Sequence, residues 1–213
     1  MSLTLIIIIL TGLISMQAFN NPNVRGQLIF HPVTIRETGQ WYRFLTHGLI
    51  HGDLQHLLIN MFVLWQFGTV IEDVFMSVFG GLFGRLAFVF LYFSAIVVAS
   101  VSSYFKHRYN YGYSAVGASG ATSALVFSYI LFAPWQWFIF PPLPAILFGV
   151  AYLWYSSYME KRGMDNIGHN AHFWGAVYGA IFTLVALTLA RPEFLLYFIA
   201  ELAKGPSMPS FLN

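Results

Sequence analysis

A serine between two glycines is the first group in this chain that could do chemistry. The segment Gly117, Ala118, Ser119, Gly120 opens an apolar run that continues to residue 133, which places Ser119 at the first turn of an expected helix. A hydroxyl in hydrocarbon needs a partner, and glycine is favoured where the backbone turns sharply or another backbone comes close. The sequence therefore predicts that a second chain segment approaches Ser119.

A segment suited to that approach begins with a histidine. His172, Gly175 and Gly179 stand at i, i+3 and i+7 and so share one helical face. Small residues four apart let a neighbouring helix approach closely, and the glycines beside Ser119 offer a complementary surface. The imidazole could then lie within hydrogen-bond reach of the hydroxyl. A neutral imidazole that accepts the proton makes serine an effective nucleophile.

Further polar groups precede another apolar run. Residues 46–68 read THGLIHGDLQHLLINMFVLWQFG, with His47, His51, His56 and Asn60 at or just inside a membrane boundary. His56 and Asn60 are four apart, so on a helix they point the same way. Two such donors could bind the negative oxygen of a tetrahedral intermediate, although interhelical hydrogen bonding in a bundle also explains them. The spacing of His51 and His56 differs from the zinc-binding H-E-x-x-H pattern, so no metal site is expected.

The composition places these groups in a membrane. The chain is 58% hydrophobic and only 8% charged, far from the usage of soluble domains. Its apolar runs predict an all-α polytopic bundle of six transmembrane helices within residues 1–190. The expected spans are residues 3–19, 55–71, 86–104, 119–133, 145–158 and 171–190. The ten basic residues are scattered, which argues against binding of nucleic acid.

The segments between and after the spans carry further expectations. Residues 20–53 are long and aromatic, so we expect an ordered loop at the membrane interface. Residues 191–213 form a short tail in which FLLYFIAEL could lie along the interface as an amphipathic helix. Glu72 and Asp73, at the far end of the second span, are expected to be solvated or to cap the interface. Ser119, His172 and His56 each fall near the start of an even-numbered span, so alternating passes bring them to one side.

Together these motifs resemble those of the rhomboid intramembrane serine proteases. The chain has G-x-S-G at 117–120, H-x-x-G-x-x-x-G at 172–179 and H-x-x-x-N at 56–60, and the resemblance extends over nearly the whole chain. It implies a dyad in which Ser119 is the nucleophile and His172 the general base. It also implies an oxyanion hole made by His56, Asn60 and the backbone N–H of Ser119. The supporting residues would be Gly117, Gly120, Gly175, Gly179, His47 and His51.

Two positions bear on how His172 would be oriented. Asp165 precedes His172 by seven residues, about 10 Å along any shared helix, so a third, carboxylate member is not evident. Ser123 stands where many rhomboids carry an aromatic residue stacked on the catalytic histidine. We expect another aromatic residue, Trp174 or Tyr178, to orient His172 instead.

The implied activity is that of an intramembrane serine endopeptidase. It would cleave transmembrane segments of other membrane proteins within the lipid bilayer and would need no cofactor and no metal. The alternative is a non-proteolytic rhomboid-like protein that binds transmembrane clients, but the intact Ser119 and His172 argue against it. A solute transporter would need a charged residue at mid-span, and the expected spans contain none.

The orientation in the membrane is predicted differently by charge and by resemblance. The loops on the active side hold seven basic residues and the opposite side three, so the positive-inside rule places the active side in the cytoplasm. The seven are Arg25, Arg36, Arg43, Lys106, Arg108, Lys161 and Arg162; the three are Arg85, Arg191 and Lys204. The family implies the reverse, a bacterial inner-membrane protein whose active site opens to the extracytoplasmic side. Long folded loops translocate largely regardless of charge, so we expect the orientation that the family implies, with the active site on the extracytoplasmic side.

Overall fold

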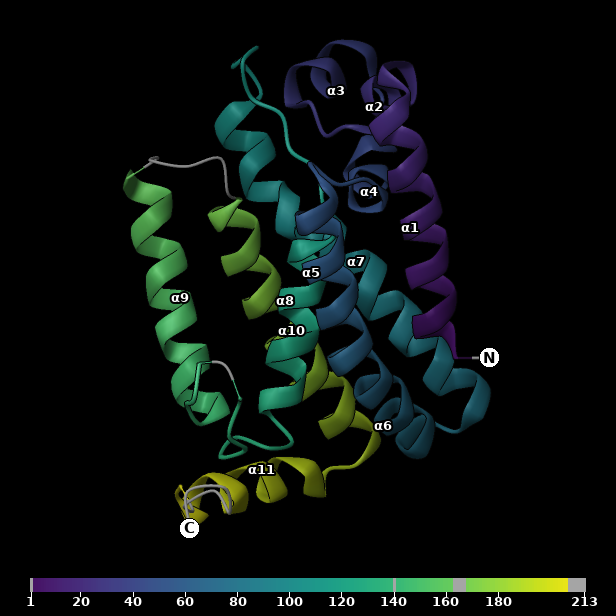
Figure 1. The fold of residues 1–213 in the computed structure, drawn as a ribbon. Helices are drawn as coiled ribbons and strands as arrows, with labels where there is room; N and C mark the ends of the chain where they lie inside the picture. The colour runs from purple at the N-terminus through teal and green to yellow at the C-terminus, as the bar shows by residue number, and fades with distance from the viewer. Residues whose placement is uncertain (1, 140, 163–167, 207–213) are drawn as a thin grey trace.

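The computed structural model describes residues 2–139, 141–162 and 168–206, and this part of the chain is all-helical, without strands. Most of the helices stand side by side, with α1 (Leu3–Asn20) and α9 (Ala145–Arg162) on opposite sides of the bundle (Figure 1). The other long helices are α7 (Gly81–His107) and α10 (His169–Ala190). The expected all-α bundle is thus confirmed.

The short helix α8 (Ser119–Ile130) lies at the centre of the bundle, where nine of its twelve residues are buried. At 1.5 Å per residue it is about 18 Å long, less than the thickness of a bilayer core. Four helical stretches of the described chain are long and apolar enough to span: residues 3–20, 54–79, 81–107 and 169–190. The predicted count of six spans is therefore not confirmed, because α8 is short and α9 does not meet the same hydropathy criterion.

The second apolar segment is longer than the sequence predicted. It begins as α5 (Leu54–Val63), passes through a π-helical turn (Leu64–Gly68) and continues as α6 (Thr69–Phe79). The expected end of the second span at residue 71 was therefore wrong, since the helix continues to Phe79. The chain reverses at Gly80, whose φ of 84° suits glycine, and α7 starts at the next residue.

The first loop is ordered, as expected, and forms a cap on one end of the bundle (Figure 1). It contains α2 (Pro22–Leu28), α3 (Pro32–Thr38), α4 (Arg43–Thr46) and a 3₁₀ turn (His47–Leu49). The buried Arg43 guanidinium donates to the carbonyls of Gly26 and Ile29, which ties α4 to the C-terminal end of α2. The cap also pairs with the segment before α8, since Phe30 and Ala115 exchange backbone hydrogen bonds.

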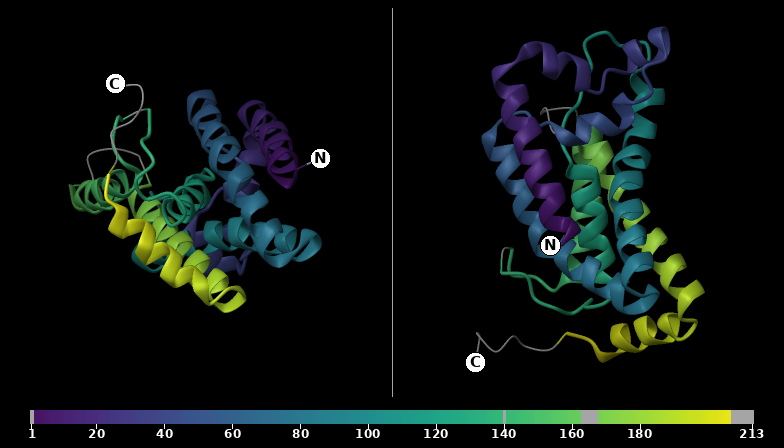
Figure 2. Two further views of the ribbon diagram at one scale, coloured as in Figure 1. Left: turned by 90° about the horizontal axis from the view of Figure 1, so that it is seen from below. Right: turned by 90° about the vertical axis from the view of Figure 1, so that its right-hand side faces the viewer.

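The tail contains the expected helix. This helix, α11 (Glu193–Lys204), lies across the end of the bundle opposite the cap (Figures 1 and 2). Two hydrogen bonds tie it to the segment after α8: the Tyr197 hydroxyl donates to the Phe132 carbonyl and the Trp135 indole to the Leu202 carbonyl. Residues 207–213 of the predicted tail lie outside the described part.

Candidate active site

Ser119 and His172 lie on helices that are in backbone contact. Ser119 is the first residue of α8, and His172 is in the first turn of α10. A Cβ atom added to Gly175 would stand 2.1 Å from the carbonyl oxygen of Gly120, and one added to Gly179 would stand 2.2 Å from that of Ala124. Glycine is thus required at both α10 positions, and the predicted complementary glycine surfaces do meet.

Ser119 and His172 are both partly buried at this contact. Both belong to the described residues, and no direct hydrogen bond joins their side chains. Residues that form catalytic hydrogen bonds are often farther apart before substrate binds. At the next position along α8, a Cβ added to Gly120 would lie 3.5 Å from the carbonyl of Ala171, the residue before His172. The close backbone approach therefore places both residues at the same helix–helix junction.

The three predicted motifs share one end of the bundle. The helices α5, α8 and α10 all start near the cap and run away from it (Figure 1). This common start is the arrangement expected from even-numbered spans. It brings His56, on the first turn of α5, close to the residues just before Ser119.

The His56 ring lies against Gly117. A Cβ added to Gly117 would stand 2.8 Å from His56 Nε2, and its φ of 116° also favours glycine. On the other side of the ring, the Gly52 backbone N–H donates to His56 Nδ1 over 3.4 Å. A neutral ring that accepts at Nδ1 carries its proton on Nε2. His56 therefore presents an N–H donor near the segment that leads into Ser119.

His47 and His51 hold that segment in place from the cap. The His47 carbonyl accepts the Gly117 N–H at 2.9 Å, and His51 Nε2 accepts the Ala118 N–H at 3.3 Å. His51 Nδ1 then carries the proton and faces the Ser15 hydroxyl at 3.0 Å. Burial lowers the pKa of His47 to about 4 and that of His51 to about 3, so both rings are neutral at pH 7.

The backbone N–H groups of the next two residues, Ser119 and Gly120, are not held in this way. Within the residues that the structure describes, no acceptor binds the N–H of Ser119 or Gly120. Both donors belong to the first turn of α8, where a helix leaves its N–H groups without intrahelical partners. They therefore remain for an anionic or partly negative oxygen.

Asn60 joins α5 to the first turn of α8. Its amide nitrogen donates to the His56 carbonyl at 2.9 Å, and its oxygen accepts the Thr122 hydroxyl at 3.2 Å. Thr122 Oγ1 also lies 3.2 Å from the Ser119 carbonyl. An amide nitrogen has two hydrogens, so one remains for another acceptor. Sequence analysis missed Thr122, although it stands three residues after Ser119 and so near the same helical face.

The His172 ring stacks on Tyr152 of α9, with centroids 6.0 Å apart and planes 21° apart. This corrects the expectation that Trp174 or Tyr178 orients His172. The Trp174 side chain is 42% exposed, and the Tyr178 hydroxyl is hydrogen-bonded to Ser94 on α7. Asp165, considered as a third member, lies outside the described residues.

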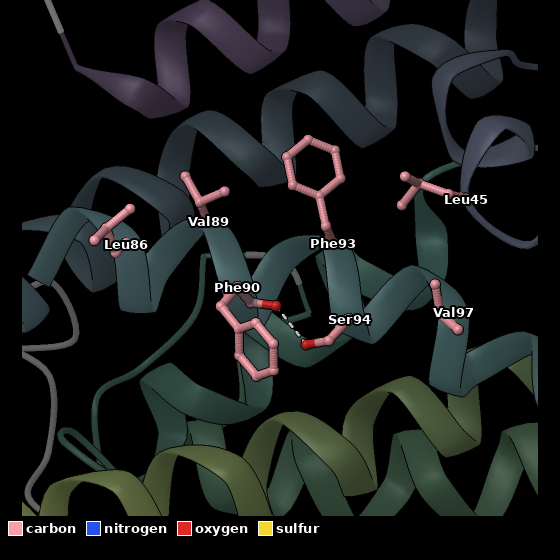
Figure 3. Close-up of a pocket in the computed structure, with 7 residues that line it drawn as sticks. All are labelled: Leu45, Leu86, Val89, Phe90, Phe93, Ser94 and Val97. Atoms are coloured by element: carbon pink, nitrogen blue, oxygen red, sulfur yellow. Dashed lines mark hydrogen bonds between the residues drawn. The ribbon is translucent and has the colours of Figure 1, made fainter. Parts of the chain in front are cut away.

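An apolar hollow lies elsewhere on the surface. It is lined by residues of α7 and by Leu45 of the cap, and Ser94 is its one polar lining residue (Figure 3). The Ser94 hydroxyl is already bonded to the Phe90 carbonyl and to Tyr178. None of the predicted site residues lines this hollow.

Comparison with known proteins finds one family. A family model described as the Rhomboid domain matches residues 38–189. The chain is 34% identical to rhomboid protease GluP of Bacillus subtilis over 83 residues, which are 39% of this chain and 14% of that protein. It is 27% identical over 165 residues to RHOMBOID-like protein 12, mitochondrial, of Arabidopsis thaliana, covering 68% of this chain and 46% of that protein.

A third relative is the putative rhomboid protease YdcA of Bacillus subtilis. The identity is 27% over 92 residues, which are 43% of this chain and 41% of that protein. The chain spans less than half the length of the curated relatives it matches.

Proposed function

Because this chain belongs to the rhomboid family, we propose that it is an intramembrane serine endopeptidase that cleaves transmembrane segments of other membrane proteins. The observation that carries the proposal is the glycine contact between α8 and α10. This contact joins the starts of two helices of the bundle, one of which carries Ser119 and the other His172. Polar groups inside a membrane are costly to maintain, which favours a catalytic role for Ser119 and His172 over a purely structural one.

In the proposed mechanism, Ser119 Oγ attacks the scissile carbonyl carbon while His172 accepts the hydroxyl proton. The carbonyl oxygen becomes an oxyanion, and His172 then delivers its proton to the leaving nitrogen as the acyl-enzyme forms. In the second half, water attacks the acyl carbon while His172 accepts a proton from it. The bond between the acyl carbon and Ser119 Oγ then breaks, and His172 returns the proton to Oγ. These steps need only side chains and water, so no metal or cofactor is proposed.

The oxyanion would be bound at the first turn of α8. The Ser119 N–H, the His56 Nε2–H and the second Asn60 amide hydrogen supply three donors from two helices. His47 and His51 fix the two preceding N–H groups and thereby hold the turn, so these donors are set before the reaction begins. Preorganised donors lower the barrier because they need not reorient when charge develops.

A fluorophosphonate probe tests the nucleophile assignment, since it reacts covalently with an activated serine. We expect labelling of the parent protein and loss of labelling in both Ser119→Ala and His172→Ala. Ser114→Ala, which removes an exposed serine from the same loop, is the matched control and should label like the parent. Equal labelling of the parent, Ser119→Ala and His172→Ala would contradict the proposal.

For the location, we propose a bacterial inner membrane with the site open to the extracytoplasmic side. The folded cap supports this choice over the simple count of basic residues, because folded loops translocate largely regardless of charge. A topology reporter fused after residue 213 distinguishes the two orientations. The tail helix α11 lies at the end of the bundle opposite the cap, so the reporter should be active in the cytoplasm.

A non-proteolytic membrane protein that binds transmembrane clients is the alternative. It would use the same bundle but would not need Ser119 or His172. Client binding that persists in Ser119→Ala, together with no cleavage by the parent protein, would favour it.

A further inference from the structure

Tyr152 is in contact with both of the helices that carry the proposed dyad. Its ring stacks on His172 of α10, and its hydroxyl lies 2.7 Å from Ser123 Oγ of α8. Ser123 is 5% exposed and stands one turn after Ser119, so the two serines share a helical face. One side chain of α9 thus reaches the segment of Ser119 and the ring of His172 together.

A Ser-His dyad needs its imidazole in one orientation, and a carboxylate does this in a triad. Rotation of the imidazole about its side-chain bonds would take its nitrogens out of alignment with the serine hydroxyl. A flat aromatic surface parallel to the imidazole restricts that rotation. The Tyr152 ring is itself fixed, because Phe127 and Phe148 pack around it at centroid distances of 5.9 and 5.7 Å.

Ser123 suits this arrangement by size and by chemistry. Its small side chain leaves room between α8 and α9 for the Tyr152 ring, which a larger residue at 123 would fill. Its hydroxyl also provides the partner that a buried phenol requires. The serine that departs from the common rhomboid pattern is therefore the residue that anchors the replacement ring.

We propose that Tyr152 is the positioning residue of His172 and that Ser123 fixes Tyr152 in that role. This inference rests on the proposed protease function. It couples the docking of α9 to catalysis, because moving α9 away from α8 also takes the ring away from His172. Other contacts of α9 lie in its last two turns, where Tyr155 packs edge-on against His169 and Glu160 accepts the Asn170 N–H and pairs with Lys106.

Replacing Tyr152 tests the ring and the hydroxyl separately. Tyr152→Leu should lower kcat on a model transmembrane substrate about 10- to 100-fold with little change in KM, because misaligned catalytic groups cost rate rather than binding. Tyr152→Phe keeps the ring and should lower kcat only about threefold, the effect of one lost hydrogen bond. The rate of fluorophosphonate labelling should likewise fall more in Tyr152→Leu than in Tyr152→Phe.

A double-mutant cycle tests the link to Ser123. Ser123→Ala removes the same hydrogen bond and should match Tyr152→Phe, and the two changes together should be no worse than either alone. The matched control is Trp154→Leu, which removes a 66% exposed aromatic from α9. It should leave kcat unchanged.

A rescue separates positioning from simple support of the fold. Combining Tyr152→Ala with Ser123→Tyr moves the aromatic ring from α9 to α8. We expect this pair to recover much of the rate that Tyr152→Ala loses, which restored packing of α9 alone would not produce. Thermal unfolding in detergent is measured for every variant.

The outcomes separate the inference from the function on which it rests. Parent-like kcat in Tyr152→Leu, or additive losses in the double mutant, would overturn the role of Tyr152 and leave the protease intact. If Tyr152→Leu fails to fold, a parent-like kcat in both Tyr152→Phe and Ser123→Ala would overturn it equally. A parent protein that neither labels nor cleaves would contradict the proposed function itself.

Discussion

The carbonyl oxygen of Gly120 lies 2.1 Å from the place that a Cβ atom on Gly175 would occupy. No side chain fits there without moving one backbone away from the other. The same holds one turn further along α10, where Gly179 faces the carbonyl of Ala124. The position of His172 relative to Ser119 therefore depends on two glycines that take no part in the chemistry.

Gly175→Ala should separate α8 from α10 and both destabilise the protein and slow its reaction. Overpacking costs about 1–3 kcal/mol, and here the opposing atoms are backbone, which yields least. Thermal unfolding and the rate of fluorophosphonate labelling measure the two effects. Gly12→Ala is the control, because nothing lies within 4 Å of that position. Its free energy of unfolding should not fall, since alanine favours a helix interior by up to about 1 kcal/mol over glycine. Unchanged labelling in Gly175→Ala would contradict the dependence on this contact.

His56→Ala and Asn60→Ala should each lower kcat while leaving the nucleophile in place. Removing one oxyanion donor costs about 10²- to 10³-fold in kcat, because the developing charge loses a preorganised partner. Cleavage of a model membrane substrate measures this, and Gln55→Ala, an exposed neighbour, is the control. Asn60→Ala also breaks the bond to Thr122 and should lower stability as well. Full activity in both variants would contradict the oxyanion role.

Much of this architecture could be predicted from the sequence because its signals are local. Apolar runs mark membrane helices, and Gly175 with Gly179 marks a close helix contact on a single face. The order of the motifs also predicts that His56, Ser119 and His172 gather at one end of the bundle. The helix contact is inferred from residues within two turns of each other, and the common end of the bundle follows from the order of the spans alone.

The rest depends on contacts between distant segments, which periodicity does not encode. Tyr152 reaches His172 only because α9 packs beside α10, and nothing within α9 itself distinguishes this tyrosine from Tyr155. The buried state of Glu72 was missed for the same reason. Its partners lie 68 and 69 residues away, at the start of α1. Of the two expected roles, solvated or capping the interface, solvation is wrong, and the buried carboxylate caps the start of α1.

Glu72→Ala should loosen the start of α1. The carboxylate is 1% exposed and accepts the backbone N–H groups of Leu3 and Thr4 at 2.8 and 2.9 Å, as well as the Thr4 hydroxyl at 2.8 Å. A negative charge at a helix N-terminus also interacts favourably with the helix dipole. We expect a loss of about 3 kcal/mol, given about 1.5–3 kcal/mol for a hydrogen bond to a charged group.

Thermal unfolding in detergent measures this loss, and Asp73→Asn provides the control. Asp73 is the exposed neighbour on the same helix, so its change should stay within about 0.5 kcal/mol. Glu72→Gln keeps the shape of the side chain but not its charge. Its unfolding temperature should lie between those of Asp73→Asn and Glu72→Ala. Equal unfolding temperatures for the parent and Glu72→Ala would show that the capping contacts do not stabilise α1.

The stability of the protein should fall as the pH drops below about 6.5, the ordinary pKa of histidine. Burial lowers the pKa of His47 to about 4 and that of His51 to about 3, so the folded protein keeps both rings neutral. The unfolded chain binds protons at these residues from about pH 6.5 downward, so acid favours unfolding. Stability is fully present above pH 6.5 and decreases toward pH 4, by up to about 1.4 kcal/mol per pH unit for each ring.

Unfolding free energies measured between pH 7 and pH 4.5 give this slope. His51→Gln removes one titrating ring and should reduce the slope even if it lowers stability at every pH, whereas an unchanged slope would show that His51 is not held neutral by the fold.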